Sequence, residues 1–195
     1  MFKFLPVFFN NEFYDRRKSI VTVVIPGAVS QERRDYQHIL SKIITFKKKT
    51  HFRFVFLGKA HGKELLRLQD FEKNKPENVS VKYFTEKVPQ NIFDEWMSKA
   101  DILWCPIQSE TEFFSNKEFY GITKISGNIG DAIKYGKPAV FPENYPNSHP
   151  FILPENSNIE EQLFTSQKWM DYDFQQEFNK RKISEDLEKA LNNLI

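Results

Sequence analysis

The sequence has one cysteine and seven glycines among its 195 residues, and it contains no long apolar run. A single cysteine, Cys105, can neither close a disulfide within the chain nor supply a cysteine-based zinc site. Because Cys105 lies in an apolar run over 102–106, we interpret it as a buried structural thiol. No apolar stretch approaches the roughly 20 residues that cross a bilayer. These absences favour a cytoplasmic chain that is soluble or attached to a membrane only peripherally.

The sequence also lacks a large excess of charge of either sign. The 28 Lys and Arg residues nearly balance the 26 Asp and Glu residues, for a net charge of +2. We therefore expect no nucleic-acid partner, and any anion site must be local. No G-x-G-x-x-G follows the first predicted strand, which disfavours an NAD-dependent enzyme. There is no G-x-S-x-G segment of a hydrolase, and the histidines lack metal-ligand spacing, so no metal is expected.

What the sequence does contain is an alternation of strands and helices. The β-branched run 20–26 predicts a strand that is buried on both faces. Further strands are expected over 52–57, closed by Gly58, and over 79–84, 102–106 and 138–141. Helices are expected over 33–50, 63–74, 91–99 and 126–135, the last ending at Gly136. In the second helix Leu65, Leu66, Leu68 and Phe71 are expected to point inward.

This alternation predicts an α/β fold, a doubly wound Rossmann-like parallel sheet of five to six strands with helices on both faces, plus C-terminal helices. Residues 19–145 would form this domain, 1–18 an interdomain connection, and 146–195 a linker and helical tail. Segment 142–154 has four prolines and no periodicity, which favours a linker or a segment that wraps around the domain. The aromatic residues Trp169, Tyr172, Phe174 and Phe178 are expected either to pack on this sheet or to contact another domain.

Ligands of such sheets bind beyond the carboxyl ends of the strands, and the first loop there is 27–34. It places Gly27 directly after the strand, with Arg33 and Arg34 at the start of the next helix. Glycine permits close approach of the backbone, a helix start offers free N–H groups, and guanidinium groups bind phosphate. The loop therefore predicts an anion site, with a surface ion pair to Glu32 or Asp35 as the alternative.

A second anion site is predicted at the helix start near residue 126. Lys124 precedes Ser126 and Gly127, so a cation, a hydroxyl and free N–H groups converge, although an ordinary Ser126 cap is the alternative. Glu118 before this turn and Asp131 within the helix can accept hydrogen bonds from sugar hydroxyls, or simply be solvated. Two such loops on one sheet edge suit a diphosphate, which needs donors from more than one loop.

The segment 118–138, EFYGITKISGNIGDAIKYGKP, and the order of elements over 19–142 resemble the C-terminal, donor-binding domain of retaining GT-B glycosyltransferases. The likeness is to the large family of bacterial polysaccharide and glycan glycosyltransferases. That family has a Glu-x-Phe-Gly segment and then a helix that opens Glu-Ala-Met and ends Gly-x-Pro-Val-Val. Here Glu118, Gly121, Asp131 and the run 136–138 fall at those places. Twelve residues separate the two acids, more than is usual in the family, and the second acid is Asp.

The resemblance implies transfer of a hexose-type sugar from a UDP-sugar or GDP-sugar to a glycan or lipid-linked acceptor, with no metal and no cofactor. It implies that Arg33 or Arg34, Lys124 and the backbone at Ser126 and Gly127 hold the donor diphosphate. Glu118 would approach the sugar and Asp131 the ribose. Glu118, Lys124 and Arg33 would be catalytic, the two cations stabilising the departing diphosphate.

The resemblance also implies an N-terminal acceptor-binding domain, in cis or in trans, which these 195 residues do not supply. The isolated half is therefore expected to be inactive. The parent enzyme is expected in the cytoplasm, with peripheral association at the inner face of the membrane left open. The altered acid spacing permits one alternative, a catalytically silent Rossmann-like module that docks a partner.

Overall fold

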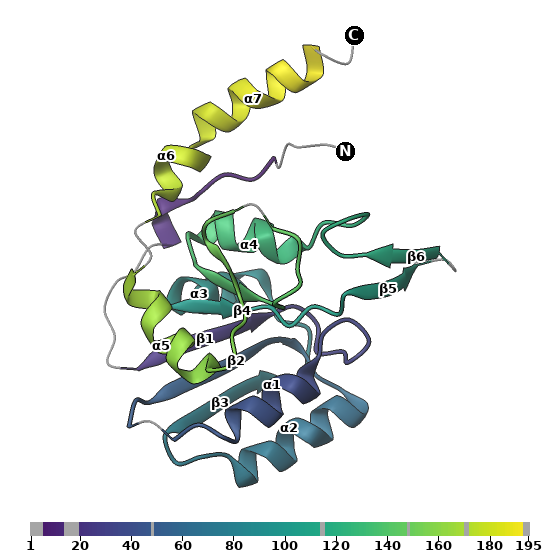
Figure 1. The fold of residues 1–195 in the computed structure, drawn as a ribbon, viewed down its shortest axis with the longest axis vertical. Helices are drawn as coiled ribbons and strands as arrows, with labels where there is room; N and C mark the ends of the chain where they lie inside the picture. The colour runs from purple at the N-terminus through teal and green to yellow at the C-terminus, as the bar shows by residue number, and fades with distance from the viewer. Residues whose placement is uncertain are drawn as a thin grey trace.

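The structure is a computed structural model that describes residues 6–13, 20–47, 49–113, 116–147, 149–169 and 172–192. Six parallel strands form one sheet in the order β3-β2-β1-β4-β7-β8, and helices cover both of its faces (Figure 1). The strands of this sheet are β1 (Val21–Pro26), β2 (Phe52–Lys59), β3 (Val79–Phe84), β4 (Ile102–Trp104), β7 (Ala139–Phe141) and β8 (Ile152–Pro154). The predicted doubly wound α/β fold is therefore confirmed, with six strands.

The helices divide between the two faces of the sheet. The helices are α1 (Tyr36–Ile43), α2 (Gly62–Asn74), α3 (Gln90–Lys99), α4 (Gly127–Tyr135), α5 (Ile159–Trp169), α6 (Phe174–Phe178) and α7 (Lys180–Asn192), and η1 (Asn11–Phe13) is a short 3-10 helix. One apolar cluster joins the sheet to α1, α2 and α5, and a second joins it to α3, α4 and α6. All six residues of β1 are buried, as expected for a strand covered on both sides.

Helix α4 begins and ends where its sequence predicts. The Ser126 hydroxyl accepts a hydrogen bond from the Asn128 N–H (3.2 Å), which caps the first turn. Gly136 ends the helix with φ +60, the left-handed conformation in which glycine has no Cβ penalty. Local chemistry therefore fixes both ends of the helix that follows the predicted anion turn.

Three local predictions were wrong. Helix α1 is shorter than 33–50, because the Asp35 carboxylate caps it at the His38 N–H (3.0 Å) and it ends at Ile43. Gly58 does not close the second strand but lies inside β2. Leu66 is 65% exposed, because it lies about 100° around α2 from Leu65 and so leaves the inward face.

Three strands were missed. The predicted polar loop after β4 contains an antiparallel hairpin, β5 (Glu110–Phe113) and β6 (Asn116–Phe119), which projects from the domain (Figure 1). The proline-rich segment, predicted as a linker or wrapping segment, contains β8, which pairs with β7 as an edge strand of the main sheet. Pro154 is tolerated at the end of β8 because an edge strand does not need every N–H group.

The tail packs on this domain's own core. Phe174 is buried, and Tyr172 and Phe178 contact the fully buried Phe151, so packing on the sheet is the correct alternative for these three rings. The side chain of Trp169 lies outside the described residues. The described part of the predicted connection, 6–13, lies against the tail, where the Phe9 N–H donates to the Phe178 carbonyl (2.8 Å).

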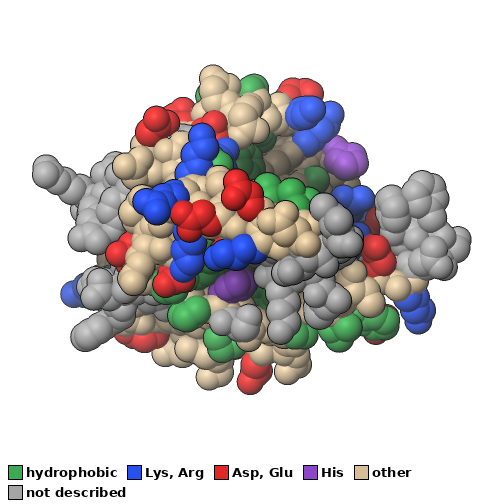
Figure 2. Space-filling view, turned by 90° about the horizontal axis from the view of Figure 1, so that it is seen from above, with side chains coloured by type: hydrophobic (Ala, Val, Ile, Leu, Met, Phe, Trp, Pro, Cys, Tyr) green, Lys and Arg blue, Asp and Glu red, His purple; other side chains and the backbone are tan. Residues whose placement is uncertain are grey.

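Helix α7 extends away from the sheet and has no buried residue (Figure 1). Figure 2 shows the molecule from this end, where Lys and Arg side chains are interspersed with Asp and Glu side chains. The visible described surface therefore mixes both signs of charge, in keeping with the net charge of +2.

Candidate functional site

The two predicted anion loops meet at the switch point of the sheet, between β1 and β4. The chain leaves β1 toward β2 and β3 on one side, and leaves β4 toward β7 and β8 on the other. At such a point the two loops diverge and leave a crevice beyond the carboxyl ends of the strands. Residues 27–34 follow β1, and the start of α4 faces them from the other side.

Gly27 has φ +106, and its Cα is covered by Arg34. A Cβ built on Gly27 would lie 2.3 Å from an Arg34 guanidinium nitrogen. The room that glycine provides here is thus taken up by a side chain of the same loop. Gly58 makes a similar close approach from β2, because its Cβ would lie 2.1 Å from the Gly27 carbonyl oxygen.

Arg34 joins the loop after β1 to the start of α4. Its Nη2 donates to Asn128 Oδ1 (3.1 Å), and Asn128 Nδ2 in turn donates to Asp131 Oδ2 (3.0 Å). Arg34 Nε is buried without a hydrogen-bond partner within the described part of the chain. The two predicted anion loops are therefore held together by a direct side-chain contact.

Asp131 is partly buried beneath this contact. Burial raises the pKa of its carboxyl group above the ordinary value, while the hydrogen bond from Asn128 and the charge of Arg34 act in the opposite direction. Its Oδ2 faces Asn128 inside the cluster, so in this structure Asp131 organises the start of α4.

Arg33 and Gly127 are the open members of the predicted set. Arg33 is exposed, and its side chain makes no ion pair with Glu32 or Asp35 among the described residues. A Cβ on Gly127 would meet nothing within 4 Å, so a ligand can reach this backbone directly. The N–H groups of Asn128 and Ile129 already donate to the Ser126 hydroxyl and carbonyl oxygens, so the backbone that an anion can reach at this helix start is that of Gly127.

Lys124 and Glu118 form an ion pair with each other. Their side chains are 32% and 27% exposed, and Lys124 Nζ also lies 5.5 Å from the centre of the Tyr120 ring. Glu118 belongs to β6, so the hairpin positions the carboxylate and the following turn positions the lysine. The predicted phosphate ligand and the predicted sugar ligand thus neutralise each other in this structure.

Asn128 is a site residue that the sequence reasoning missed. Its amide contacts Arg34, Asp131 and the Pro26 carbonyl oxygen (3.4 Å) and so spans the switch point. Its position could have indicated this role, because Asn128 lies two residues after the Ser126 cap, in the turn that was predicted to bind an anion. The Asn128 side chain is only 3% exposed, whereas a polar residue beside an ordinary helix cap can remain in solvent.

A separate cavity of about 470 Å³ lies beside this region and was not predicted. It is lined by α1, by Tyr120 and by segments 106–109, 142–146 and 155–157. None of the eight predicted site residues lines it. Tyr120 connects the two places, because it lies in the turn between Glu118 and Lys124.

Other titratable groups carry structural roles. Cys105 is fully buried, and burial raises the pKa of its thiol, in agreement with the predicted structural role. His149 stacks on Phe151 at 5.1 Å, and burial lowers the pKa of its imidazole. Within the described ranges, no three His, Cys, Asp or Glu side chains are grouped so as to hold a metal ion. No described helix is long and apolar enough to cross a bilayer.

Comparison with known proteins gives structural relatives. No protein-family model and no curated protein sequence matches the chain. The crystal structure of TarM matches 95% of this chain with a TM-score of 0.54 and 14% identity. The apo form of WaaB, a lipopolysaccharide outer core galactosyltransferase, matches 99% with a TM-score of 0.54 and 10% identity.

The chain spans 37% of the TarM chain and 53% of the WaaB chain. At such low identity the likeness concerns the fold, and the fold agrees with the sheet order and the two helical layers described above. The chain has a glycosyltransferase-like fold, that of one Rossmann-like half of a GT-B glycosyltransferase.

Proposed function

We propose that this chain is the nucleotide-sugar-binding domain of a glycosyltransferase that transfers a hexose-type sugar to a glycan or lipid-linked acceptor. The donor would be a UDP-sugar or a GDP-sugar. The acceptor-binding domain would be an N-terminal domain in cis or a separate chain. Retention of the anomeric configuration and independence from metal ions belong to the same proposal.

One observation carries the proposal: the basic loop after β1 and the start of α4 meet at the switch point of the sheet. The Arg34 to Asn128 hydrogen bond (3.1 Å) joins them, and the Gly127 backbone beside it is open. A helix start attracts phosphate through its free N–H groups and its dipole. Arg33 is exposed on the same loop and can add a charged contact to a diphosphate.

The proposed chemistry places positive charge where the leaving group becomes negative. As the bond to the sugar breaks, charge accumulates on the nucleotide diphosphate, and Arg33 and Lys124 would stabilise it. Both groups are side-chain cations, so they can act in this role without a metal ion. Asp131, held by Asn128, would keep the first turn of α4 in place beneath the donor.

Binding of the donor would break the ion pair between Lys124 and Glu118 and free both side chains to contact the donor. A diphosphate competes with Glu118 for Lys124, because a phosphate group is the more highly charged acceptor. Once Lys124 turns to the phosphate, the Glu118 carboxylate is free to accept hydrogen bonds from sugar hydroxyls. Donor binding would therefore exchange one ion pair for two ligand contacts.

The test is calorimetric titration of the chain with UDP, GDP and ADP, and with UDP-sugars and GDP-sugars. We expect binding of UDP or GDP, weakened about tenfold or more by Lys124→Ala, since a hydrogen bond to a charged group contributes about 1.5–3 kcal/mol. Lys117→Ala is the matched control, because Lys117 is an exposed lysine of the same hairpin outside the predicted site. It should leave the affinity unchanged.

Two results would contradict the proposal. The first is absence of heat and of any thermal shift with all the nucleotides at millimolar concentration. The second is equal nucleotide affinity in the wild type, Lys124→Ala and Lys117→Ala. Either result would favour a module that keeps the fold for docking a partner.

A further inference from the structure

The cavity of about 470 Å³ has a position and size that suit a ligand of its own. It lies at the carboxyl ends of β4, β7 and β8, where segments 106–109, 142–146 and 155–157 follow these strands, and α1 closes one side. Its volume falls within the roughly 300–1,000 Å³ that is usual for small-molecule sites. It shares no residue with the proposed diphosphate site.

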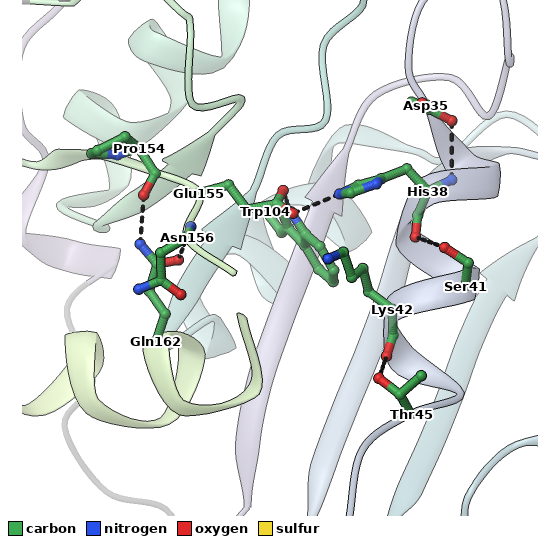
Figure 3. Close-up of polar contacts among 10 residues, drawn as sticks. All are labelled: Asp35, His38, Ser41, Lys42, Thr45, Trp104, Pro154, Glu155, Asn156 and Gln162. Atoms are coloured by element: carbon green, nitrogen blue, oxygen red, sulfur yellow. Dashed lines mark hydrogen bonds and ion pairs between the residues drawn. The ribbon is translucent and has the colours of Figure 1, made fainter. Parts of the chain in front are cut away.

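One wall of the cavity is a fixed polar cluster (Figure 3). Glu155, only 11% exposed at its side chain, accepts from Trp104 Nε1 at 2.9 Å and contacts His38 Nε2 at 2.5 Å. Trp104 is fully buried at the end of β4, and His38 belongs to α1. Both carboxylate oxygens are thus engaged, so Glu155 and His38 form a preformed wall between the helix and the edge of the sheet.

Other residues of the lining carry unused hydrogen-bonding groups. The side chains of Ser109, Glu143, Asn144 and Ser157 make no hydrogen bond to any residue in the described part of the chain. Together they offer hydroxyl, amide and carboxylate groups, which both donate and accept. A ligand rich in hydroxyl groups can satisfy such a mixed set, because each hydroxyl also donates and accepts.

Rings complete the lining. Tyr120, Tyr145, Pro142 and Pro146 contribute flat apolar surface, and Tyr145 is held against Phe141 at 4.7 Å between ring centres. A pyranose has polar edges and an apolar C–H face, so it can place that face on a ring while its hydroxyls reach the polar groups.

The charge of the lining excludes the most obvious alternative, a second nucleotide or phosphate. Three carboxylates, Asp35, Glu143 and Glu155, face one lysine, Lys42, and a histidine that is charged only when protonated. An excess of carboxylates repels an anion but does not disfavour a neutral polyol. The lining therefore selects for many hydroxyls and against negative charge.

We propose that this cavity binds a neutral saccharide unit, at a site separate from the nucleotide site at α4. The proposal rests on the cavity alone and does not require that the chain bind a nucleotide. It adds a second carbohydrate-recognising surface to the same domain, on the α1 face of the sheet and connected to the nucleotide site through Tyr120.

The test is saturation-transfer difference NMR of the full chain with methyl α-glucoside, methyl β-galactoside, N-acetylglucosamine and maltose. We expect saturation transfer to at least one of these sugars. The double variant Glu143→Ala/Asn144→Ala should bind that sugar about tenfold more weakly, because it removes two hydrogen-bonding side chains. Both positions are exposed, so the variant should fold, which its circular dichroism spectrum and its UDP titration would check.

Lys124→Ala is the cross-control, since Lys124 lies outside the cavity. It should weaken UDP binding and leave saccharide binding unchanged. The proposal is overturned by absence of saturation transfer with every sugar, by equal sugar binding in the folded double variant, or by loss of sugar binding in Lys124→Ala. A failure of UDP binding with sugar binding retained would contradict the nucleotide proposal alone.

Discussion

Close backbone packing at single residues shapes the switch point. Gly58 lies against the Gly27 carbonyl, and Gly27 lies against the Arg34 guanidinium. Arg34 is then held by Asn128 from the far side of the crevice. The geometry of the proposed site therefore depends on two residues without side chains as much as on its charged groups.

Gly58→Ala should lower the free energy of unfolding by about 1–3 kcal/mol, the usual cost of forcing atoms into a packed region. A Cβ at Gly58 would lie 2.1 Å from a backbone oxygen, which cannot swing away as a side chain can. Gly127→Ala is the matched control, because a Cβ there meets nothing within 4 Å. Urea unfolding followed by circular dichroism would measure both, and equal stability of the two variants would contradict this account.

The same control variant tests access to the site. Gly127→Ala should fold as the wild type does yet bind UDP more weakly, because a methyl group would stand where the diphosphate approaches the backbone. Calorimetric titration provides the measurement. Unchanged UDP affinity in Gly127→Ala would show that the ligand does not approach this turn.

Asp131 predicts a dependence of stability on pH. Burial raises its pKa in the folded chain above the ordinary 3.8, so the folded chain binds the proton more tightly than the unfolded chain. The stabilisation that comes from the protonated Asp131 carboxyl group is thus fully present below pH 3.8. It is lost as the pH rises through the folded-state pKa of that group. Asp131→Asn should be more stable than the wild type at neutral pH, and the difference should vanish in acid. Urea unfolding at several pH values would detect this, and a less stable variant at neutral pH would refute it.

Among the elements, those with local sequence signals were predicted, and those without such signals were not. Ser126 and Gly136 mark the ends of α4 by their own chemistry, and both were confirmed. The β5–β6 hairpin and β8 have no comparable local mark. β8 exists because Ile152 pairs with Ala139 on β7, a contact that a reading of the proline-rich segment alone does not contain.

The aromatic cluster that attaches the tail gives a prediction at this scale. Phe151 is fully buried and contacts Tyr172, Phe174 and Phe178. Phe151→Ala should cost about 3–5 kcal/mol of stability. Leu191→Ala on α7 is the control, because Leu191 is 53% exposed and its loss should change stability by no more than about 0.5 kcal/mol. Thermal unfolding would compare them, and a small effect at Phe151 would show that the tail contributes little.

For the whole molecule, the fold was readable because strands and helices alternate along most of the chain. The parallel sheet follows from buried runs such as β1, and the ligand-binding edge follows from the sheet. For the candidate nucleotide site, the same rules predicted which loops lie together at the edge of the sheet. The direct contacts of Arg34 with Asn128 and of Lys124 with Glu118 depend on side-chain positions that no spacing rule supplies.

The cavity was not predicted as a binding site. Its lining comes from five separate stretches of the chain, and the pair that forms one wall joins His38 to Glu155 across 117 positions. Neither residue belongs to a sequence motif. Taken alone, each is most simply interpreted as a solvated surface side chain. Only the folded sheet brings α1 next to the segment after β8.

The close approach of Gly27 and Gly58 also constrains how this protein can evolve. A side chain at position 58 requires the backbone at 27 to move, and that movement displaces the guanidinium at 34. Positions 27, 34 and 58 should therefore change together among homologous chains or not at all, although Gly58 lies in β2 and the other two lie in the loop after β1. Such covariation would extend to position 128, whose amide receives Arg34.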